Sequence, residues 1–377
     1  MSKKILFLCE DIWSMGEKKG VSSLYRLIQT VKYEFEVAVL QPVPQNFYVK
    51  NRYIQYLLNM LFYIRNNIKY IILGIRQKNK PDVIYASSSL PSFAAYFLSK
   101  YYDIPYLQRL YGTFLFHKLG NKIELLKNYQ EVISFLLPAN KYIITDDGTY
   151  GDRVAKYFGI SEEKIFFEKN GVDKLALEKK TLFRGEIRKE LNIPENALVV
   201  ISVSRLVQWK RVDRSIMAFN KISDKDIFLI IVGDGEERAK YEKLKKNSNI
   251  IFTGALTGEK VKEFMLASDI FISMYDLSNL GNPLLEAMSA GLATITLDIG
   301  NTKDVYNGKN MILLEHKSEE EIINSLVHTI LELKINFKER ISLQESARAY
   351  AESNLLTWEE RINKEFKEIV YWSNKYE

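Results

Sequence analysis

Cysteine and histidine are scarce in this chain of 377 residues. The single cysteine, Cys9, lies in an apolar run, so the chain forms no internal disulfide and gives no sign of an oxidising compartment. The three histidines are scattered at positions 117, 316 and 328, a spacing that argues against a zinc cluster, and we predict no metal site. The run KKILFLCED near the start is too short for a signal peptide, so we expect a cytoplasmic protein.

Acidic residues are absent from positions 37–81, where seven lysines and arginines carry a charge of +7, against +6 for the whole chain. These cations are interleaved with tyrosines and aliphatic residues over a helix-length run, 52–76. Arg65 and Lys69 interrupt the run too centrally for a transmembrane helix. Two interpretations remain for residues 50–80: an amphipathic helix on an anionic membrane surface, or a long helix that packs its apolar face on a sheet. No motif supports nucleic-acid binding.

Apolar runs alternate with helix-like segments along the chain, a pattern typical of α/β proteins with parallel sheets. We expect strands at 5–9, 35–40, 83–86, 106–110, 141–145, 164–167, 198–204, 227–232, 250–253, 270–274 and 292–297. Helices are expected between them, including one at 121–136. The pattern predicts two Rossmann-like domains, 1–173 and 174–355, with the polar segment 174–190 as a hinge. Two such sheets would face one another across a cleft at their carboxyl edges, where open α/β sheets bind ligands.

The stretch 278–291, SNLGNPLLEAMSAG, predicts a helix that begins at a ligand. Pro283 lies just inside the expected helix and Gly291 just past its end. A buried strand, a glycine loop and a helix start, in that order, place unpaired N–H groups and the positive end of the helix dipole at the carboxyl edge of the sheet. Phosphate is therefore the expected ligand. Glu286 either holds sugar hydroxyls or is an ordinary helix-surface glutamate.

Other strand ends in the second half carry cations or glycines at the same edge. Arg205 and Lys210 follow the strand at 198–204 and would face phosphates, although either alone would be a solvated base. Gly233 and Gly254 end the next two strands, where a glycine lets the backbone approach a ligand. On its own, Gly233 is explained by a tight turn. The prediction depends on several independent strand ends that meet at one edge.

The first half offers fewer candidates for ligand binding. Gly16 and Gly20 follow the first strand, and Gly20 is placed to open the next helix toward a phosphate. Residues after the strand at 106–110 are candidates to face a second substrate: Arg109, Tyr111, Gly112 and, in the loop beyond, His117. A histidine in such a position is more often a plain loop residue than a base.

With these residues in place, the second half resembles the family 4 retaining glycosyltransferases, also called glycosyl transferases group 1. The resemblance lies in stretches that occur in the family's order and spacing: VSRLVQWKRVDRSIMAF, IIVGDGEERAKYEKL, NIIFTGALTGEKVKEFMLASDIFIS and GNPLLEAMSAG. The shorter NGVD at 170–173 and LLTWEER around Trp358 also match, so the resemblance covers most of residues 140–370. It implies the GT-B architecture of two facing Rossmann-like domains, with a final helix, 356–377, that crosses back onto the first domain.

The resemblance also implies roles for individual residues. Arg205 and Lys210 would bind the donor pyrophosphate, and Glu286 the nucleotide ribose. The backbone of the helix start would meet the phosphates, and the loop after the strand at 250–253 would meet the base. The donor-binding residues implied in these two segments are Gly281, Asn282, Leu284, Gly254 and Leu256.

Two positions depart from the family pattern. Ser278 stands where the family has a glutamate near the donor sugar, and Asp276, two residues earlier, is a weak candidate to replace it. Tyr111 precedes Gly112 where the family often has histidine before glycine. The departures concern the donor sugar and the acceptor side, and leave nucleotide diphosphate binding largely unaffected.

The resemblance implies a retaining glycosyltransferase that moves a sugar from a nucleotide diphosphate sugar to a hydroxyl of a glycan or lipid-linked glycan, as cell-surface polysaccharide assembly needs. No metal or other cofactor is required by this scheme. The basic segment would hold the enzyme at the inner face of a membrane. Two alternatives remain: a sugar-nucleotide epimerase of the same architecture, and a subunit that binds nucleotide or glycan without turnover.

Overall fold

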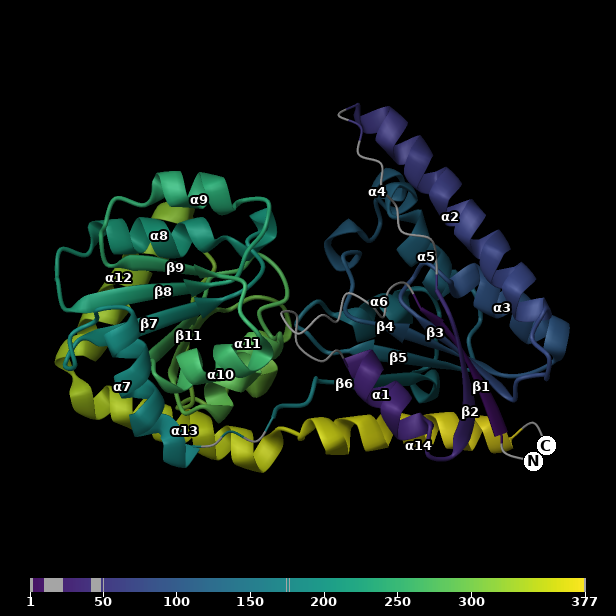
Figure 1. Cartoon of the computed structure of the whole chain (residues 1–377). Coiled ribbons are helices and arrows are strands. Elements are labelled where there is room, and N and C mark those ends of the chain that lie inside the picture. The colour runs from purple at the N-terminus through teal and green to yellow at the C-terminus, as the bar shows by residue number, and fades with distance from the viewer. Residues whose placement is uncertain are drawn as a thin grey trace. The chain divides into compact units, whose positions relative to one another are not determined.

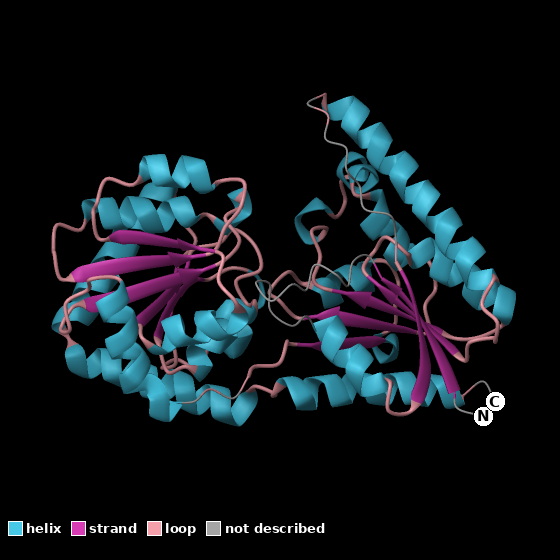
Figure 2. Cartoon of the chain, in the orientation of Figure 1, coloured by secondary structure: helices cyan, strands magenta, loops and turns pink. Residues whose placement is uncertain are grey.

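The computed structural model describes residues 3–9, 23–41, 49, 51–173, 175 and 177–375. Contacts divide the chain into two compact units. Unit 1 holds the chain up to Lys169 together with Glu359–Glu377, and unit 2 holds Asn170–Trp358. Unit 1 is therefore built from two segments that are distant in the sequence. Both units are layered α/β structures (Figures 1 and 2).

Unit 1 contains a sheet of six parallel strands in the order β2-β1-β3-β4-β5-β6. The strands are β1 (Lys3–Cys9), β2 (Phe35–Leu40), β3 (Val83–Ser87), β4 (Tyr106–Leu110), β5 (Lys141–Thr145) and β6 (Ile165–Glu168). Its helices are α1 (Ser23–Val31), α2 (Arg52–Ile75), α3 (Ser92–Tyr102), α4 (Lys122–Lys127), α5 (Tyr129–Leu136), α6 (Gly151–Tyr157) and α14 (Trp358–Asn374), with short 3-10 turns η1 (Phe116–Lys118) and η2 (Glu162–Lys164).

Side chains of the unit 1 strands alternate between two faces of the sheet. Leu6, Ile84 and Tyr106 lie on the face that packs against α2, α3, α5 and α6. The opposite face meets α14 (Figure 1). There the rings of Phe35 and Phe366 lie 6.3 Å apart. Because both faces are covered, the strands are nearly continuous apolar runs, as expected for a parallel sheet.

Unit 2 contains a second sheet of six parallel strands, in the order β12-β11-β10-β7-β8-β9. The strands are β7 (Leu198–Val203), β8 (Ile227–Val232), β9 (Ile250–Gly254), β10 (Ile270–Ser273), β11 (Ala293–Leu297) and β12 (Ile312–Leu314). Its helices are α7 (Lys180–Glu190), α8 (Val212–Lys221), α9 (Arg238–Leu244), α10 (Gly258–Leu266), α11 (Asn282–Ser289), α12 (Glu319–Ile335) and α13 (Phe337–Asn354), with 3-10 turns η3 (Leu177–Lys179), η4 (Gln208–Lys210) and η5 (Gly300–Val305).

Two apolar layers cover the faces of the unit 2 sheet. One layer includes α8, α9 and α12, and the other includes α7, α10 and α11 (Figure 1). The two fully parallel sheets with helices on both faces confirm the predicted class of two Rossmann-like domains. No helix among the described residues combines the length and apolar character that a membrane span requires.

Three local predictions were wrong. The segment predicted as a hinge, 174–190, contains helix α7, whose Ile187 is buried in unit 2, and the division between the units falls earlier, after Lys169. Strand β12 was missed. The single helix expected at 121–136 is two helices, because Asn128 leaves the helical conformation at φ −105° and ψ 33°. The contacts divide the chain after Lys169 and after Trp358, whereas the predicted domains end at 173 and 355.

Candidate functional site

Backbone hydrogen bonds join neighbouring loops at the carboxyl edge of the unit 2 sheet. The N–H of Leu206, after β7, donates to the carbonyl of Asp234, after β8, at 2.9 Å. The N–H of Asp276, after β10, donates to the carbonyl of Trp209 at 3.0 Å. These bonds bring together the loops that carry the cations, the glycines and the helix start selected from the sequence.

Lys210 is held between two aromatic rings and a carbonyl. Its Nζ lies 4.0 Å from the ring centre of Tyr275 and 4.2 Å from that of Trp209, and the side chain is 9% exposed. Nζ also donates to the carbonyl of Ser278 at 3.4 Å. Tyr275 is fixed in turn, because its hydroxyl donates to the carbonyl of Val203 at 2.9 Å. Cation–π contact and burial therefore hold this ammonium group in place at the end of the sheet.

Arg205 differs from Lys210 in its surroundings. Its side chain is exposed and makes no hydrogen bond, ion pair or ring contact within the part of the chain that the structure describes. An exposed guanidinium at the carboxyl edge of a sheet suits bidentate contact with a phosphate.

Ser278 adopts a left-handed backbone conformation, with φ at 58°. Such a conformation costs a residue with a side chain roughly 1–2 kcal/mol, so the surrounding loop has to hold it. Asn279 does so: its side-chain amide donates to the carbonyl of Tyr275 at 2.9 Å, and its Oδ1 accepts from the N–H of Tyr275 at 3.3 Å. The strained turn directs the Ser278 carbonyl toward Lys210.

Asp276 belongs to a network of ion pairs and does not stand alone near Ser278. Its carboxylate lies 2.8 Å from Arg214 and 3.4 Å from Arg211, and both arginines also pair with Glu319 at 2.6 Å. Hydrogen bonds from Arg214 and Arg211 lower the pKa of Glu319 to about 2. The carboxylate of Asp276, the weak candidate to replace the family's glutamate, is directed to this network.

Helix α11 begins as the sequence predicted. Gly281 is the N-cap and Pro283 lies in the first turn. The side chain of Asn282 is anchored, because Nδ2 of Asn170 donates to its Oδ1 at 2.6 Å.

Two side chains of α11 differ in burial. Leu284 is buried in the core of unit 2, whereas Glu286, one turn into the helix, is half-buried. The helix therefore presents its N-terminus at the edge that carries Arg205 and Lys210, as an anion site requires.

The glycines at this edge have a structural reason of their own. Gly233 has φ at 136°, and a Cβ on it would lie 1.8 Å from the carbonyl oxygen of Ser204. Gly254 also has a left-handed φ, 76°, and its carbonyl accepts from the N–H of Gly233 at 2.9 Å. Leu256, two residues on, packs half-buried against the apolar layer of α7, α10 and α11. The close approach of neighbouring loops is sufficient to require glycine at 233.

Arg109 does not face a ligand, and the prediction that it contacts an acceptor was wrong. Its side chain is 1% exposed, and its Nε lies 3.5 Å from the carboxylate of Glu365 in α14. Glu365 also accepts hydrogen bonds from Arg361, at 2.8 Å, and from the hydroxyl of Tyr85. Burial opposes ionisation of Glu365, but the charges of Arg109 and Arg361 prevail and hold its pKa below the usual value. This buried cluster fixes α14 to the sheet.

The other unit 1 candidates lie near the surface. The ring centre of Tyr111 lies 4.5 Å from the Arg109 guanidinium, and its hydroxyl lies 2.9 Å from that of Ser87.

Gly112, the next residue, has φ at 104°, and a Cβ on it would lie 2.5 Å from the Asp147 carboxylate. His117 is exposed in η1. Gly16 and Gly20 lie outside the described residues.

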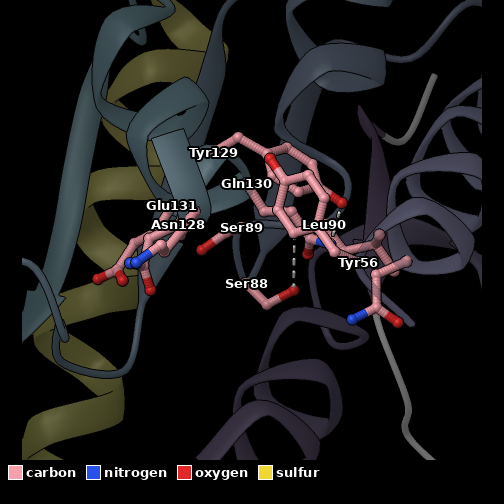
Figure 3. Close-up of a pocket in the computed structure, with 10 residues that line it drawn as sticks. Tyr56, Ser88, Ser89, Leu90, Asn128, Tyr129, Gln130 and Glu131 are labelled. Atoms are coloured by element: carbon pink, nitrogen blue, oxygen red, sulfur yellow. Dashed lines mark hydrogen bonds between the residues drawn. The ribbon is translucent and has the colours of Figure 1, made fainter. Parts of the chain in front are cut away.

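A pocket of about 340 Å³ in unit 1 was not predicted. It is lined by α2, by the loop after β3 and by the junction of α4 and α5, including Ser88, Ser89 and Glu131 (Figure 3). A signal for it was present in the sequence, because serines at 87–89 end a buried strand, as Arg205 does in unit 2. Polar residues at the carboxyl end of a parallel strand are typical of ligand sites.

Comparison with known proteins identifies relatives that match up to about two thirds of this chain. Residues 183–350 match the family described as glycosyl transferases group 1. The chain is 30% identical over 265 residues to the uncharacterized glycosyltransferase MJ1069 of Methanocaldococcus jannaschii, covering 68% of this chain and 62% of that protein. It is 25% identical over 258 residues to the sulfoquinovosyl transferase SQD2 of Arabidopsis thaliana, covering 66% of this chain and 49% of that protein. The matches thus span between about half and three-fifths of these relatives.

Among solved structures, Anabaena HepE in complex with UDP and glucose superposes with a TM-score of 0.69. The sequence identity is 18%, and the match covers 98% of this chain and 99% of the other. At this identity the likeness concerns the fold, which is GT-B.

Proposed function

Because this chain belongs to the group 1 glycosyltransferases, we propose that it transfers a sugar from a nucleotide diphosphate sugar to a hydroxyl of a glycan or lipid-linked glycan. The observation that supports this proposal best is the edge of the unit 2 sheet, where an exposed Arg205, the clamped Lys210 and the start of α11 meet. This edge lies in the segment that matches the family, and it suits a diphosphate. The Anabaena protein of the same fold was solved with UDP and glucose.

In the proposed reaction the sugar keeps its anomeric configuration. The bond between the sugar's anomeric carbon and the diphosphate oxygen breaks, and a bond to the acceptor oxygen forms on the same face. The acceptor's proton passes to the departing phosphate. Arg205, Lys210 and the α11 dipole then stabilise the charge that develops on the diphosphate. Glu286 would accept hydrogen bonds from the ribose, and these groups together need no metal ion.

The contact between Lys210 and Ser278 supports a role for position 278 in donor recognition. Lys210 donates to the backbone carbonyl of Ser278, so the side chain at position 278 lies close to the ammonium group that would bind the diphosphate. A glutamate at this position would add a negative charge there, and serine does not. We propose that Ser278 determines which donor sugar is accepted.

The experiment is incubation of the protein with UDP-, GDP- and ADP-sugars, with and without extracts that contain lipid-linked acceptors. Release of a nucleoside diphosphate that increases with acceptor supports transfer. An isomeric sugar nucleotide would instead identify an epimerase, and binding without turnover would identify an inactive subunit.

Variants of two lysines connect this assay to the site. We expect Lys210→Ala to slow diphosphate release by roughly 10²–10³-fold, the cost of removing one preorganised charge-stabilising group. Lys225→Ala, an exposed lysine at the opposite edge of the same sheet, is the matched control and should keep full activity. Equal rates for the two variants would contradict the phosphate assignment.

We further propose that α2 holds the protein on an anionic membrane surface at the cytoplasmic side. Apolar side chains form an exposed stripe along this helix: Ile54, Leu57, Leu61, Ile64, Ile68, Ile72 and Ile75. The opposite face of α2 packs into unit 1 through Tyr63, Asn67 and Tyr70.

The charge of α2 indicates what the stripe binds. Arg65 and Lys69 flank the stripe, and no acidic residue lies on the helix. The heptad-like spacing would also suit a second helix, but two copies with only positive charge would repel each other, which favours anionic lipid.

A further inference from the structure

The unit 1 pocket is lined by three separate segments of the chain. Tyr56 comes from α2, Ser88 and Ser89 come from the loop after β3, and Asn128 and Gln130 come from the junction of α4 and α5. In Figure 3 the side chains of Asn128 and Glu131 lie to one side of the two serines, and Tyr56 lies to the other. The pocket, about 340 Å³, falls within the range of small-molecule sites in proteins. It is formed entirely within unit 1.

The lining is polar but offers little free charge. Lys127 pairs with Glu124, one turn before it. Both carboxylate oxygens of Glu131 accept from the N–H of Phe114, at 3.0 and 3.3 Å. The other polar groups of the lining are hydroxyls and carboxamides beside the tyrosine rings. The carboxamide of Asn128 is held by Lys118 and by the carbonyl of Glu124, and Nε2 of Gln130 donates to the hydroxyl of Tyr129, which positions these side chains at the pocket. Hydroxyls and carboxamides both donate and accept hydrogen bonds, so they match a ligand that is rich in hydroxyl groups and carries no charge.

Hydrogen bonds hold Ser88, a lining residue of the pocket, in an unfavourable backbone conformation. Ser88 adopts a left-handed φ of 80°. Its N–H donates to the carbonyl of Arg109 at 3.0 Å, and its own carbonyl accepts from Nε2 of Gln108 at 2.8 Å. Gln108 is fully buried, so the unfavourable backbone conformation is held from inside the core. Strained residues that are fixed in this way cluster at ligand sites.

The pocket also adjoins the exposed stripe of α2. Tyr56 lines the pocket, and its hydroxyl donates to the carbonyl of Leu126 at 3.1 Å, which ties α2 to the end of α4. Leu57, the next residue, belongs to the stripe and is half exposed. A molecule with its lipid part at the α2 surface would therefore have its head group beside the pocket.

We propose that this pocket binds a neutral glycosyl unit, the head group of the lipid-linked acceptor. The proposal rests on the proposed function, because it assigns the acceptor of the same reaction. It predicts that a free glycoside binds to unit 1 without any nucleotide.

The test is saturation-transfer NMR of the whole protein with methyl α-glucoside, methyl α-galactoside and methyl β-N-acetylglucosaminide. We expect at least one of them to bind, and inorganic phosphate not to displace it. Gln130→Ala should weaken that binding roughly tenfold, as expected for a lost hydrogen bond in a pocket. Gln77→Ala, the same change just beyond the far end of α2, is the control and should bind as the wild type does.

A second variant protects the test against loss of structure. Ser89→Trp should fill the pocket and abolish glycoside binding, and thermal unfolding and UDP binding should stay unchanged. Saturation transfer that is equal in the wild type, Gln130→Ala and Ser89→Trp would overturn the proposal, as would displacement by phosphate or no binding of any glycoside. UDP binding, measured on the same samples, separates this failure from failure of the proposed function.

Discussion

Arg109 and Glu365 form an ion pair inside unit 1, with Nε and Oε1 3.5 Å apart and neither side chain more than 3% exposed. One partner lies on the fourth strand and the other on the last helix. Arg361 and Tyr85 bond to the same carboxylate, so Glu365 is the single negative charge among four groups.

We predict that Glu365→Gln destabilises unit 1 by about 3 kcal/mol, because two buried guanidinium groups lose their counter-charge. Urea unfolding gives the loss of free energy, and hydrogen exchange of residues 361–375 reports whether α14 opens. Glu359→Gln, on an exposed position of the same helix, should leave both measurements unchanged. A Glu365→Gln protein as stable as the control would show that packing alone holds α14.

Gly233→Ala should destabilise unit 2 by more than about 3 kcal/mol or prevent its folding, because the added Cβ meets backbone at 1.8 Å and the residue has a left-handed φ. The control is Gly185→Ala, in the exposed face of α7, where a Cβ meets nothing within 4 Å. That change should stabilise the helix by about 1 kcal/mol. Thermal unfolding of the two variants compares them directly, and opposite signs are expected.

Glu319 makes stability depend on pH in the acid range. Its pKa is lowered to about 2 in the folded protein, below the usual value of 4.5, so the folded state binds fewer protons than the unfolded state between these values. The stabilisation is fully present above pH 4.5 and is lost as the pH falls toward 2. Because the pair is half exposed, Glu319→Gln should cost about 1 kcal/mol at pH 7, and it should reduce the loss of stability on acidification.

Glu320→Gln, the neighbouring exposed residue in the same helix turn, is the matched control for this experiment. Urea unfolding at pH 7, 5 and 3 measures both variants. Parallel stability profiles for Glu319→Gln and Glu320→Gln would contradict the role of the network around Asp276.

The exposed stripe of α2 predicts binding to anionic vesicles. Leu61→Ser should weaken co-sedimentation with phosphatidylserine vesicles roughly tenfold, since about 1.5 kcal/mol of apolar burial is lost. Ile335→Ser removes an exposed apolar side chain of unit 2 and should have no effect. Binding should also fall with salt and disappear with neutral lipid. If the wild-type protein instead sediments as a dimer and Leu61→Ser sediments as a monomer, the stripe is an interface between two copies of the chain.

The strands were predictable because their signal is local. Most observed bounds lie within a residue or two of the apolar runs, such as β8 at Ile227–Val232. Strand β12 has three residues, too few for a recognisable run. The polar composition of α7 resembles that of a hinge, because only Ile187 and Arg188 of this helix are buried.

The candidate site was predictable where one segment carries it, as in the start of α11 and the loop of Arg205 and Lys210. It was not predictable where the partner is distant in the chain. Arg109 follows the pattern of a strand-end cation, and only the tertiary structure shows its pairing with Glu365. The ion-pair partners of Asp276 are likewise distant in the chain: Arg211 and Arg214, at the start of α8.

The two-part composition of unit 1 has a consequence for synthesis on the ribosome. Domains generally fold as they emerge, the N-terminal one first. Here the sheet of unit 1 emerges early, but the helix that covers one of its faces and neutralises Arg109 is translated only after all of unit 2. Unit 2 is therefore the first to obtain its complete sequence. Until α14 has been made, the nascent unit 1 keeps an uncovered apolar face, which is the kind of surface that molecular chaperones bind.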